Sequence, residues 1–190
     1  MARLVQKFDG SSLNTPEKIA RAARFIVTAA ENGYEVASVV SPSKSDVNSC
    51  LSFAGNLSKN PNMREVQSLL GAYEQMSSTL LSMAIESFGF SSRSLSASAL
   101  GIESLRNIRS EDLQTSQVES CFERGEIAVI GGGSAISDAK ALPSGIIDYS
   151  DSLAIALGAA IDAEKCEYFT GDSGLFVADP LYVNNPSPVD

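Results

Sequence analysis

The sequence predicts an α/β fold, a three-layer αβα sandwich in which a mainly parallel sheet lies between two layers of helices. Residues 4–40 read as strand, glycine-containing turn, helix and strand, which is the βαβ unit of parallel sheets. Residues 127–130 form a short apolar run that leads directly into a triple glycine, as expected of a buried strand. Strand and helix patterns alternate over the whole length without an internal repeat, so one domain is expected.

The first βαβ unit has clear boundaries. Its opening strand, residues 4–8, stops at a cluster of turn residues, 9–12. Thr15 is a suitable N-cap, and the proline and the glutamate that follow it favour the first turn of a helix. Gly33 ends this helix, and residues 36–40 form the second buried strand.

The longest predicted helix begins at Asn62, with Glu65 three residues later, and Gly89 ends it. We expect its apolar stripe to face the core; the stripe consists of Val66, Leu69, Leu70, Tyr73, Met76, Leu80, Ile85 and Phe88. Residues 97–112 have no clear pattern. The other expected elements are a weak helix after 41–45, a short strand at 93–96, helices at 113–124 and 153–161, the latter capped by Ser150, and a strand at 166–170.

Composition narrows the possible chemistry. The chain has 190 residues, of which 44% are hydrophobic, enough for a sizeable core without disulfides or a structural metal. It contains no histidine, which excludes Ser-His and Cys-His catalytic pairs and removes the usual nitrogen ligand of zinc or copper. Catalysis would have to use carboxylates, lysine, backbone dipoles or a hard metal ion, and we predict no metal site built from protein ligands.

Charge and cysteine usage favour a cytoplasmic protein. A net charge of −9 disfavours binding to nucleic acid or to an anionic membrane. The three cysteines, Cys50, Cys121 and Cys166, are spaced too irregularly for a zinc knuckle or a disulfide framework. The longest apolar stretch, 153–161, is far shorter than the ~20 residues of a membrane span, and no apolar signal segment follows Met1.

Three glycine-containing turns are candidates for a binding site. They comprise residues 7–12, 131–134 and 170–174, and each follows a predicted strand. In open α/β sheets, ligands bind beyond the carboxyl ends of the strands, where such turns expose backbone N–H groups. Each turn by itself is weak evidence, because turns need glycine whatever their function.

Taken in order, these turns and their neighbours resemble the aspartokinases of the amino-acid kinase family over nearly all of the chain. That family opens with Lys-Phe-Gly-Gly-Thr-Ser, and residues 7–12 read Lys-Phe-Asp-Gly-Ser-Ser. Further segments are similar in the same order: 39–42 to Val-Val-Ser-Ala, 73–77 to a Gly-Glu-Gln-Val-Ser helix, 99–102 to Gln-Ala-Gly-Ile, and 166–170 with 178–180 to the strand and nucleotide loop near the family's end.

The resemblance implies transfer of the γ-phosphoryl group of ATP, with Mg²⁺, to the side-chain carboxylate of aspartate. Such a reaction needs cations and N–H dipoles around the transferring group. By resemblance, Lys7 bridges the phosphates and Asp151 belongs to the catalytic group; Ser41, Glu74 and Ser150 face the substrate; and Gly10, Ser11, Gly131, Gly132, Thr170, Asp172 and Gly174 belong to the phosphate and nucleotide loops.

Each of these positions also has a purely structural interpretation. Lys7 could be a solvated surface lysine, and Glu74 a solvent-facing acid on its helix. Ser150 as an N-cap and Asp151 as a first-turn acid would need no substrate. Gly131 and its neighbours could still form an anion-binding nest.

The departures from the family pattern are informative. Asp9 replaces the first glycine of the opening motif, which puts a carboxylate where N–H groups would approach phosphate. Ile147 stands in the position of the family's substrate-binding arginine, and Asp148 adds a negative charge beside it. In the nucleotide loop, 170–174 read Thr-Gly-Asp-Ser-Gly where the family has Thr-Asp-Val-Asp-Gly, so both regular aspartates are displaced or lost. Several defects in one catalytic assembly leave little rate.

We therefore expect a C-terminally shortened amino-acid kinase-like domain at 1–180, without ACT domains, followed by a surface or disordered tail at 181–190. The first hypothesis is a catalytically weak or inactive homologue that needs no cofactor and acts as a binding or assembly subunit, with another protein chain as partner, in a homo-oligomer or a larger assembly. The second is an active ATP- and Mg²⁺-dependent carboxylate kinase with an altered substrate. The third is a nucleotide or amino-acid sensor without turnover.

Overall fold

The computed structural model describes residues 1–102, 108–132, 134–136 and 146–170, and the single residues 183, 185 and 187. Its centre is a five-stranded sheet in the order β3-β4-β2-β1-β7, and every neighbouring pair is parallel. The strands are β1 Arg3–Phe8, β2 Glu35–Val40, β3 Ser92–Ser96, β4 Ile127–Gly131 and β7 Lys165–Phe169. The predicted parallel sheet is thus confirmed. Two short strands, β5 Ser134–Ile136 and β6 Ile146–Asp148, form a separate antiparallel pair.

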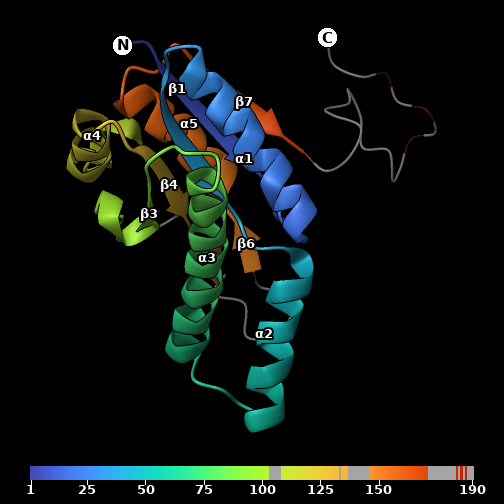
Figure 1. Ribbon diagram of the computed structural model, residues 1–190. Helices are drawn as coiled ribbons and strands as arrows, with labels where there is room; N and C mark the ends of the chain where they lie inside the picture. Colours follow the sequence, from blue (N-terminus) through green and yellow to red (C-terminus); the bar gives the residue numbers. More distant parts are fainter. Residues whose placement is uncertain are drawn as a thin grey trace.

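Helices cover both faces of the sheet (Figure 1). On one face, α1 Pro16–Glu31 and α3 Met63–Glu86 pack against Leu4, Phe8 and other residues of the same parity along the strands. On the other face, α4 Ser116–Glu123 and α5 Ser150–Ala160 pack against Val5 and its counterparts. Because side chains alternate along a strand, the two faces hold two separate apolar clusters. The structure is therefore the predicted three-layer sandwich.

Helix α2, Lys44–Leu57, packs against α3 in a small apolar cluster of its own. The two helices project from the sheet as a hairpin, whose connection lies at the far tip in Figure 1. Three short 3₁₀ helices complete the described elements: η1 Gly10–Ser12, η2 Ala97–Leu100 and η3 Ser110–Asp112. The last two lie within residues 97–112, which have no clear sequence pattern.

Two details of the helix predictions were wrong. Helix α5 begins at Ser150, so its N-cap residue is Tyr149, whose side chain makes no capping bond. The apolar stripe predicted for the long helix, which is α3, does not face the core throughout, because Met76 and Leu80 are exposed. Their places in the buried face of α3 are taken by small polar residues, Ser77, Ser78 and Ser82. Helix α3 approaches β4 closely at Ser78, because a Cβ on Gly131 of β4 would lie 2.8 Å from the Ser78 hydroxyl oxygen.

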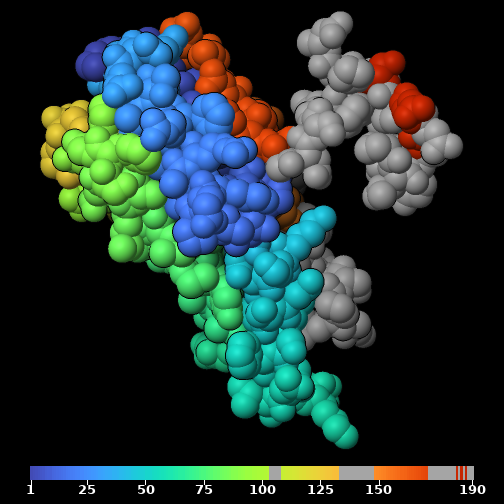
Figure 2. Space-filling view, turned by 45° about the vertical axis from the view of Figure 1, so that its right-hand side comes forward, coloured from blue at the N-terminus to red at the C-terminus, as the bar shows by residue number. Residues whose placement is uncertain are grey.

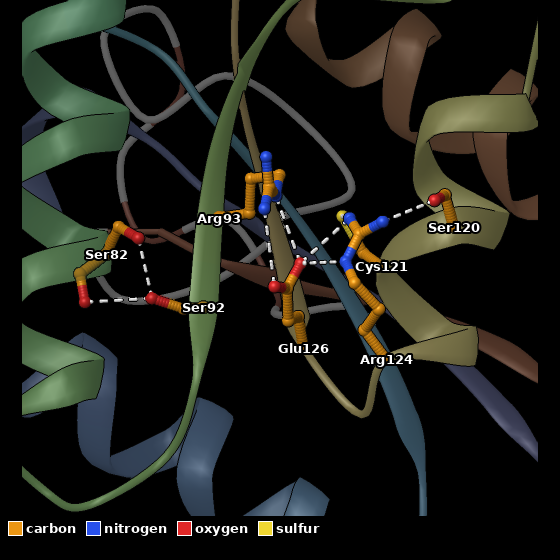
Figure 3. A network of polar contacts seen from close by, with 7 residues as sticks. All are labelled: Ser82, Ser92, Arg93, Ser120, Cys121, Arg124 and Glu126. Atoms are coloured by element: carbon orange, nitrogen blue, oxygen red, sulfur yellow. Dashed lines mark hydrogen bonds and ion pairs between the residues drawn. The ribbon is translucent and has the colours of Figure 1, made fainter.

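A charged cluster holds the amino ends of β3 and β4 together (Figure 3). Glu126 immediately precedes β4, and its carboxylate accepts hydrogen bonds from Arg93 of β3 and from Arg124. These two arginines lower the pKa of Glu126 to about 2. This end of the sheet lies opposite the glycine-containing turns, so the cluster is separate from the candidate site. None of the described helices combines the length and the apolar composition that a bilayer span requires.

Candidate functional site

The carboxyl ends of β1, β2 and β4 form one edge, at which most of the predicted site residues lie. The pairing register aligns Phe8 with Val40 and Val40 with Gly131, so the segments that follow these residues leave the sheet side by side. Ser41 directly follows β2 and is buried, and its backbone N–H donates to the carbonyl of Phe8. The alignment confirms that the first two glycine-containing turns share one edge of the sheet.

Lys7 and Asp151 meet at this edge. Lys7 Nζ lies 2.7 Å from Asp151 Oδ1. The lysine comes from β1 and points to the α5 side of the sheet, where Asp151 occupies the first turn of α5. The Lys7 side chain is 7% exposed, so its interpretation as a solvated surface lysine is wrong. The two residues that the resemblance assigns to catalysis are thus paired across two elements far apart in the sequence.

The turn after β1 is closed by its own acidic residue. Asp9 Oδ1 accepts hydrogen bonds from the Ser12 backbone N–H at 3.0 Å, from Ser11 Oγ at 2.7 Å and from Ser12 Oγ at 3.0 Å. Asp9 is therefore the N-cap of the 3₁₀ helix η1. Lys18 of α1 donates to the Ser11 carbonyl at 2.8 Å and holds the turn from outside. The Asp9 carboxylate thus occupies three hydrogen-bond donors of this turn.

Gly10 and Gly131 are required by close backbone packing. A Cβ on Gly10 would lie 2.1 Å from the Pro42 carbonyl oxygen, and a Cβ on Gly131 would lie 2.5 Å from the carbonyl oxygen of Glu74. The neighbouring N–H of Gly132 donates to the Val40 carbonyl at 3.3 Å, so it is already used. These contacts fix the turns against each other, and they account for the glycines without a bound anion.

Glu74 and Ser150 are both buried at this edge. Glu74 lies on α3 and is 6% exposed, so its interpretation as a solvent-facing acid is wrong. Ser150 is fully buried, and within the described residues its Oγ has no hydrogen-bond partner. Its backbone N–H donates to Asp148 Oδ1 at 2.9 Å. The carboxylate that the sequence marked as an adverse charge therefore caps α5, where a negative charge is favourable.

Sequence reasoning missed Tyr168. It pairs with Lys7 in the register of β7 and β1, and its hydroxyl donates to the Asp151 carbonyl at 3.0 Å. Burial, with a further contribution from Cys166, raises the pKa of Tyr168 above its ordinary value, so the phenol keeps its proton and the bond to α5. Only knowledge of which strands pair would have placed this tyrosine beside the lysine.

Of the segment 170–174, which resembles the family's nucleotide loop, only Thr170 lies within the described residues. Thr170 directly follows β7 and is exposed. Asp172 and Gly174, the Ala-Asp-Pro segment and the predicted 181–190 tail lie outside the described residues, apart from the single positions 183, 185 and 187. Within the described residues, no group of three or more acidic or cysteine side chains is arranged to hold a metal ion.

Comparison with known proteins agrees with this geometry. The model of the Amino acid kinase family matches residues 2–190. The chain is 35% identical over 194 residues to the aspartokinase of Mycolicibacterium smegmatis, covering 100% of this chain and 46% of that protein. It is 34% identical over 188 residues to aspartokinase 2 of Bacillus subtilis (strain 168), covering 97% of this chain and 46% of that protein. It therefore spans about half the length of these relatives.

Solved structures show the same fold. The aspartate kinase from Synechocystis superposes with a TM-score of 0.78 at 32% identity, over 98% of this chain and 31% of that one. The UMP kinase from Ureaplasma parvum superposes with a TM-score of 0.62 at 16% identity, over 97% of this chain and 73% of that one, which shows a shared fold alone. With the family model matched along nearly its entire length, the chain belongs to the amino acid kinase family.

Proposed function

We propose that this chain is an aspartokinase-like domain that does not transfer phosphoryl groups and acts by binding another protein chain. The observation that carries the first half is the closed turn after β1. The Asp9 carboxylate accepts from one backbone N–H and two hydroxyl groups of the same turn. A nucleotide phosphate would have to displace this carboxylate or lie beside it, and both arrangements cost free energy.

The repulsion is large enough to abolish useful binding. Two unit charges about 4 Å apart repel by roughly 4 kcal/mol at the effective dielectric constant of ~20 that suits protein surfaces. Such a penalty lowers an affinity by a factor of about 10³. Lys7, the cation that the resemblance assigns to the phosphates, is already paired with Asp151. A phosphate at this turn would therefore lie beside the Asp9 carboxylate, while the ammonium of Lys7 is held by Asp151.

The substrate side of the site is altered as well. Ile147 stands where the resemblance places the arginine that binds the substrate carboxylate. Asp148 next to it caps α5 through the Ser150 N–H. An aspartate substrate would thus lose a charge-assisted hydrogen bond, the strongest kind in such sites.

Exposed apolar side chains support the second half of the proposal. Among the described residues, Phe53 is 64% exposed and Leu57 89%, and the two lie one helical turn apart at the end of α2. In Figure 2 the hairpin of α2 and α3 stands out from the body of the molecule. Clusters of large exposed apolar residues commonly mark protein interfaces.

Calorimetric titration with Mg²⁺-ATP tests the proposal. We expect no binding heat from the unaltered chain at millimolar ATP, and binding from Asp9→Gly, which removes the carboxylate and restores the family residue. Glu17→Gln, which removes one exposed negative charge from the first turn of α1, should bind no better than the unaltered chain. Binding to the unaltered chain together with ADP release in the presence of aspartate would overturn the proposal.

A second candidate is an active carboxylate kinase with an altered substrate, favoured by the Lys7–Asp151 pair and the buried Glu74. It predicts ADP release when ATP is offered with small carboxylates other than aspartate, and loss of that release in Lys7→Met. Binding of ATP without release of ADP would instead favour the nucleotide sensor.

A further inference from the structure

A pocket lies between the amino-terminal part of α1 and the carboxyl ends of β1 and β7, and it is called the α1 pocket below. Its volume is about 290 Å³, close to the ~300 Å³ at which small-molecule sites begin. The residues that matter for its chemistry are Lys18, Arg21 and Phe25 of α1, Phe8 of β1 and Phe169 of β7. The two strand phenylalanines belong to the apolar cluster on the α1 side of the sheet, whereas Lys7 and Asp151 meet on the α5 side.

The charged side chains of the α1 pocket are all positive. Lys18 and Arg21 line it, and no acidic side chain of the described residues does. This is unexpected in a chain with 14 basic and 23 acidic residues. The ammonium of Lys18 donates one hydrogen bond to the Ser11 carbonyl at 2.8 Å, which leaves two of its N–H donors. Within the part of the chain that the structure describes, the Arg21 guanidinium has no hydrogen-bond or ion-pair partner. Both cations can therefore donate to an anion.

The other wall of the α1 pocket is aromatic. The rings of Phe8 and Phe169 are stacked, with centroids 4.5 Å apart and planes 10° from parallel. Phe25 packs against Phe169 at a centroid distance of 4.9 Å. Phe25 is 47% exposed and Phe169 is half-buried, so the stack is open to solvent on the pocket side. A further planar ring placed there would gain apolar contact and the offset stacking that aromatic rings prefer.

We infer that the α1 pocket binds a small aromatic anion, namely a single ring that carries a carboxylate or a phosphate monoester. The anionic group lies between Lys18 and Arg21, and the ring lies against Phe25 and Phe169. A guanidinium suits either anionic group, because its planar N–H donors match both in a bidentate manner. The inference goes beyond the proposed function, since the resemblance assigns no role to Lys18, Arg21 or Phe25.

NMR titration of the full isotope-labelled chain with phenyl phosphate tests the inference. We expect saturable shifts of the backbone amides of Lys18, Arg21, Phe25 and Phe169, with a Kd of about 1 mM or tighter for a ligand of this size. The amide of Asp151 should not shift. Absence of a saturable shift, or shifts confined to the edge where Lys7 and Asp151 meet, would overturn the inference.

Fragments of the ligand test whether both walls of the α1 pocket are used. Inorganic phosphate supplies the anion without the ring, and benzyl alcohol supplies the ring without the charge. Each should bind at least ~10-fold more weakly than phenyl phosphate, because each forfeits the contacts of one wall. Phenylacetate then compares the carboxylate with the phosphate as the anionic group. Inorganic phosphate that binds as tightly as phenyl phosphate would contradict the aromatic part of the inference.

Two arginines of α1 provide a matched pair of variants. Arg21→Gln should weaken phenyl phosphate binding about tenfold, the usual effect of losing a hydrogen bond to a charged group. Arg24→Gln makes the same change on the same helix, but Arg24 lies over the Phe88 ring at 5.0 Å and does not line the pocket. It should leave the affinity unchanged. Equal losses in both variants would mean that phenyl phosphate responds only to the overall charge of α1, and would overturn the site.

The aromatic wall is tested by Phe25→Leu, which keeps an apolar side chain and removes the ring. It should weaken phenyl phosphate binding and leave the binding of inorganic phosphate unchanged. Thermal unfolding of this variant and of both arginine variants verifies that the fold is kept. An equal loss of affinity for phenyl phosphate and for inorganic phosphate would show that Phe25 does not contact the ring.

Mg²⁺-ATP separates this inference from the proposed function. If phenyl phosphate binds the α1 pocket and the chain also releases ADP from ATP, the inference stands and the proposed function falls. If phenyl phosphate does not bind and ATP does not bind either, the proposed function stands without the inference. If ATP displaces phenyl phosphate and shifts the amides of Arg21 and Phe25, the pocket belongs to a nucleotide site and the inference is overturned.

Discussion

Lys7 Nζ and Asp151 Oδ1 lie 2.7 Å apart, yet the lysine side chain is 7% exposed and the aspartate side chain 66%. The buried ammonium of Lys7 therefore depends on Asp151 to balance its charge, whereas the exposed carboxylate of Asp151 is also hydrated. The pair ties β1 to the first turn of α5, and it has structural consequences that do not depend on catalysis.

We predict that Asp151→Asn destabilises the fold by about 1–2 kcal/mol, because it leaves a buried ammonium without its counter-ion and removes a favourable charge from the first turn of α5. Lys7→Met should cost less, since it keeps an apolar stem in the core and leaves Asp151 in contact with water. Urea unfolding of both variants checks this order. A larger loss in Lys7→Met would show that the pair does not control the stability of this edge.

Gly10→Ala should destabilise the fold by about 1–3 kcal/mol, the usual cost of forcing extra volume into packed structure. The reason is the Pro42 carbonyl oxygen, which lies 2.1 Å from the position of the new Cβ, so the backbone of one turn must move. Gly55→Ala is the matched control, because no atom lies within 4 Å of its Cβ position in α2. It should raise helix stability by about 0.5–1 kcal/mol. Thermal unfolding of both variants tests the contrast.

The cluster around Glu126 predicts a specific pH dependence. Hydrogen bonds from Arg93 and Arg124 hold the pKa of Glu126 at about 2, below the ordinary value of 4.5. A lowered folded-state pKa gives stability that is present above pH 4.5 and is lost as the pH falls towards 2. Glu126→Gln should therefore be less stable than the unaltered chain at pH 6, and the difference should shrink as the pH is lowered through this window.

Urea midpoints at pH 6, 4 and 3 measure this difference. Arg93→Gln removes one of the two arginines that donate to Glu126. It should make the loss of stability between pH 6 and pH 3 smaller without abolishing it. A constant difference between the unaltered chain and Glu126→Gln at all three pH values would mean that the cluster in Figure 3 contributes nothing through its charges.

The sheet and its layers could be predicted because they depend on local patterns. Residues 127–130 are apolar throughout and lie buried on both faces in β4, as such runs do in parallel sheets. The apolar positions of α3 show where this reasoning fails. Met76 and Leu80 fit the helical period as well as the core residues do, but they are exposed, while Ser77, Ser78 and Ser82 lie in the buried face of α3 beside its apolar residues. The spacing of apolar residues in the sequence shows that a helix has an apolar face. Which face of the helix the sheet covers depends on how the side chains pack in the folded structure.

In the candidate site, too, the sequence could identify some residues but not the contacts that they make. The resemblance singled out Lys7 and Asp151 separately, and the 2.7 Å contact between their side chains is a finding of the structure that the sequence did not predict. It could not show that Asp9 caps its own turn or that Asp148 caps α5, since both effects depend on hydrogen-bond geometry over two or three residues. Tyr168 was invisible for a different reason: its contact with Asp151 depends on β1 pairing with β7, strands that lie at opposite ends of the chain.

Two buried serines should respond to alanine substitution in opposite directions. Within the described residues, Ser38 Oγ in the middle of β2 is fully buried and has no hydrogen-bond partner. Ser82 of α3 is also buried, but its hydroxyl lies 2.6 Å from that of Ser92, which in turn donates to the Ser82 carbonyl (Figure 3). Removing an unsatisfied hydroxyl relieves a desolvation cost, whereas removing a bonded one leaves its partner unsatisfied.

Ser38→Ala should therefore raise the free energy of unfolding by about 1 kcal/mol, and Ser82→Ala should lower it by about 1 kcal/mol. The comparison is matched, because both changes remove one buried hydroxyl on the α1–α3 side of the sheet. Denaturant titrations with equal m-values would show that the effect lies in the folded state. A loss of stability in Ser38→Ala would contradict this prediction. It would mean that the Ser38 hydroxyl has a hydrogen-bond partner in the folded protein, such as a water buried beside β2.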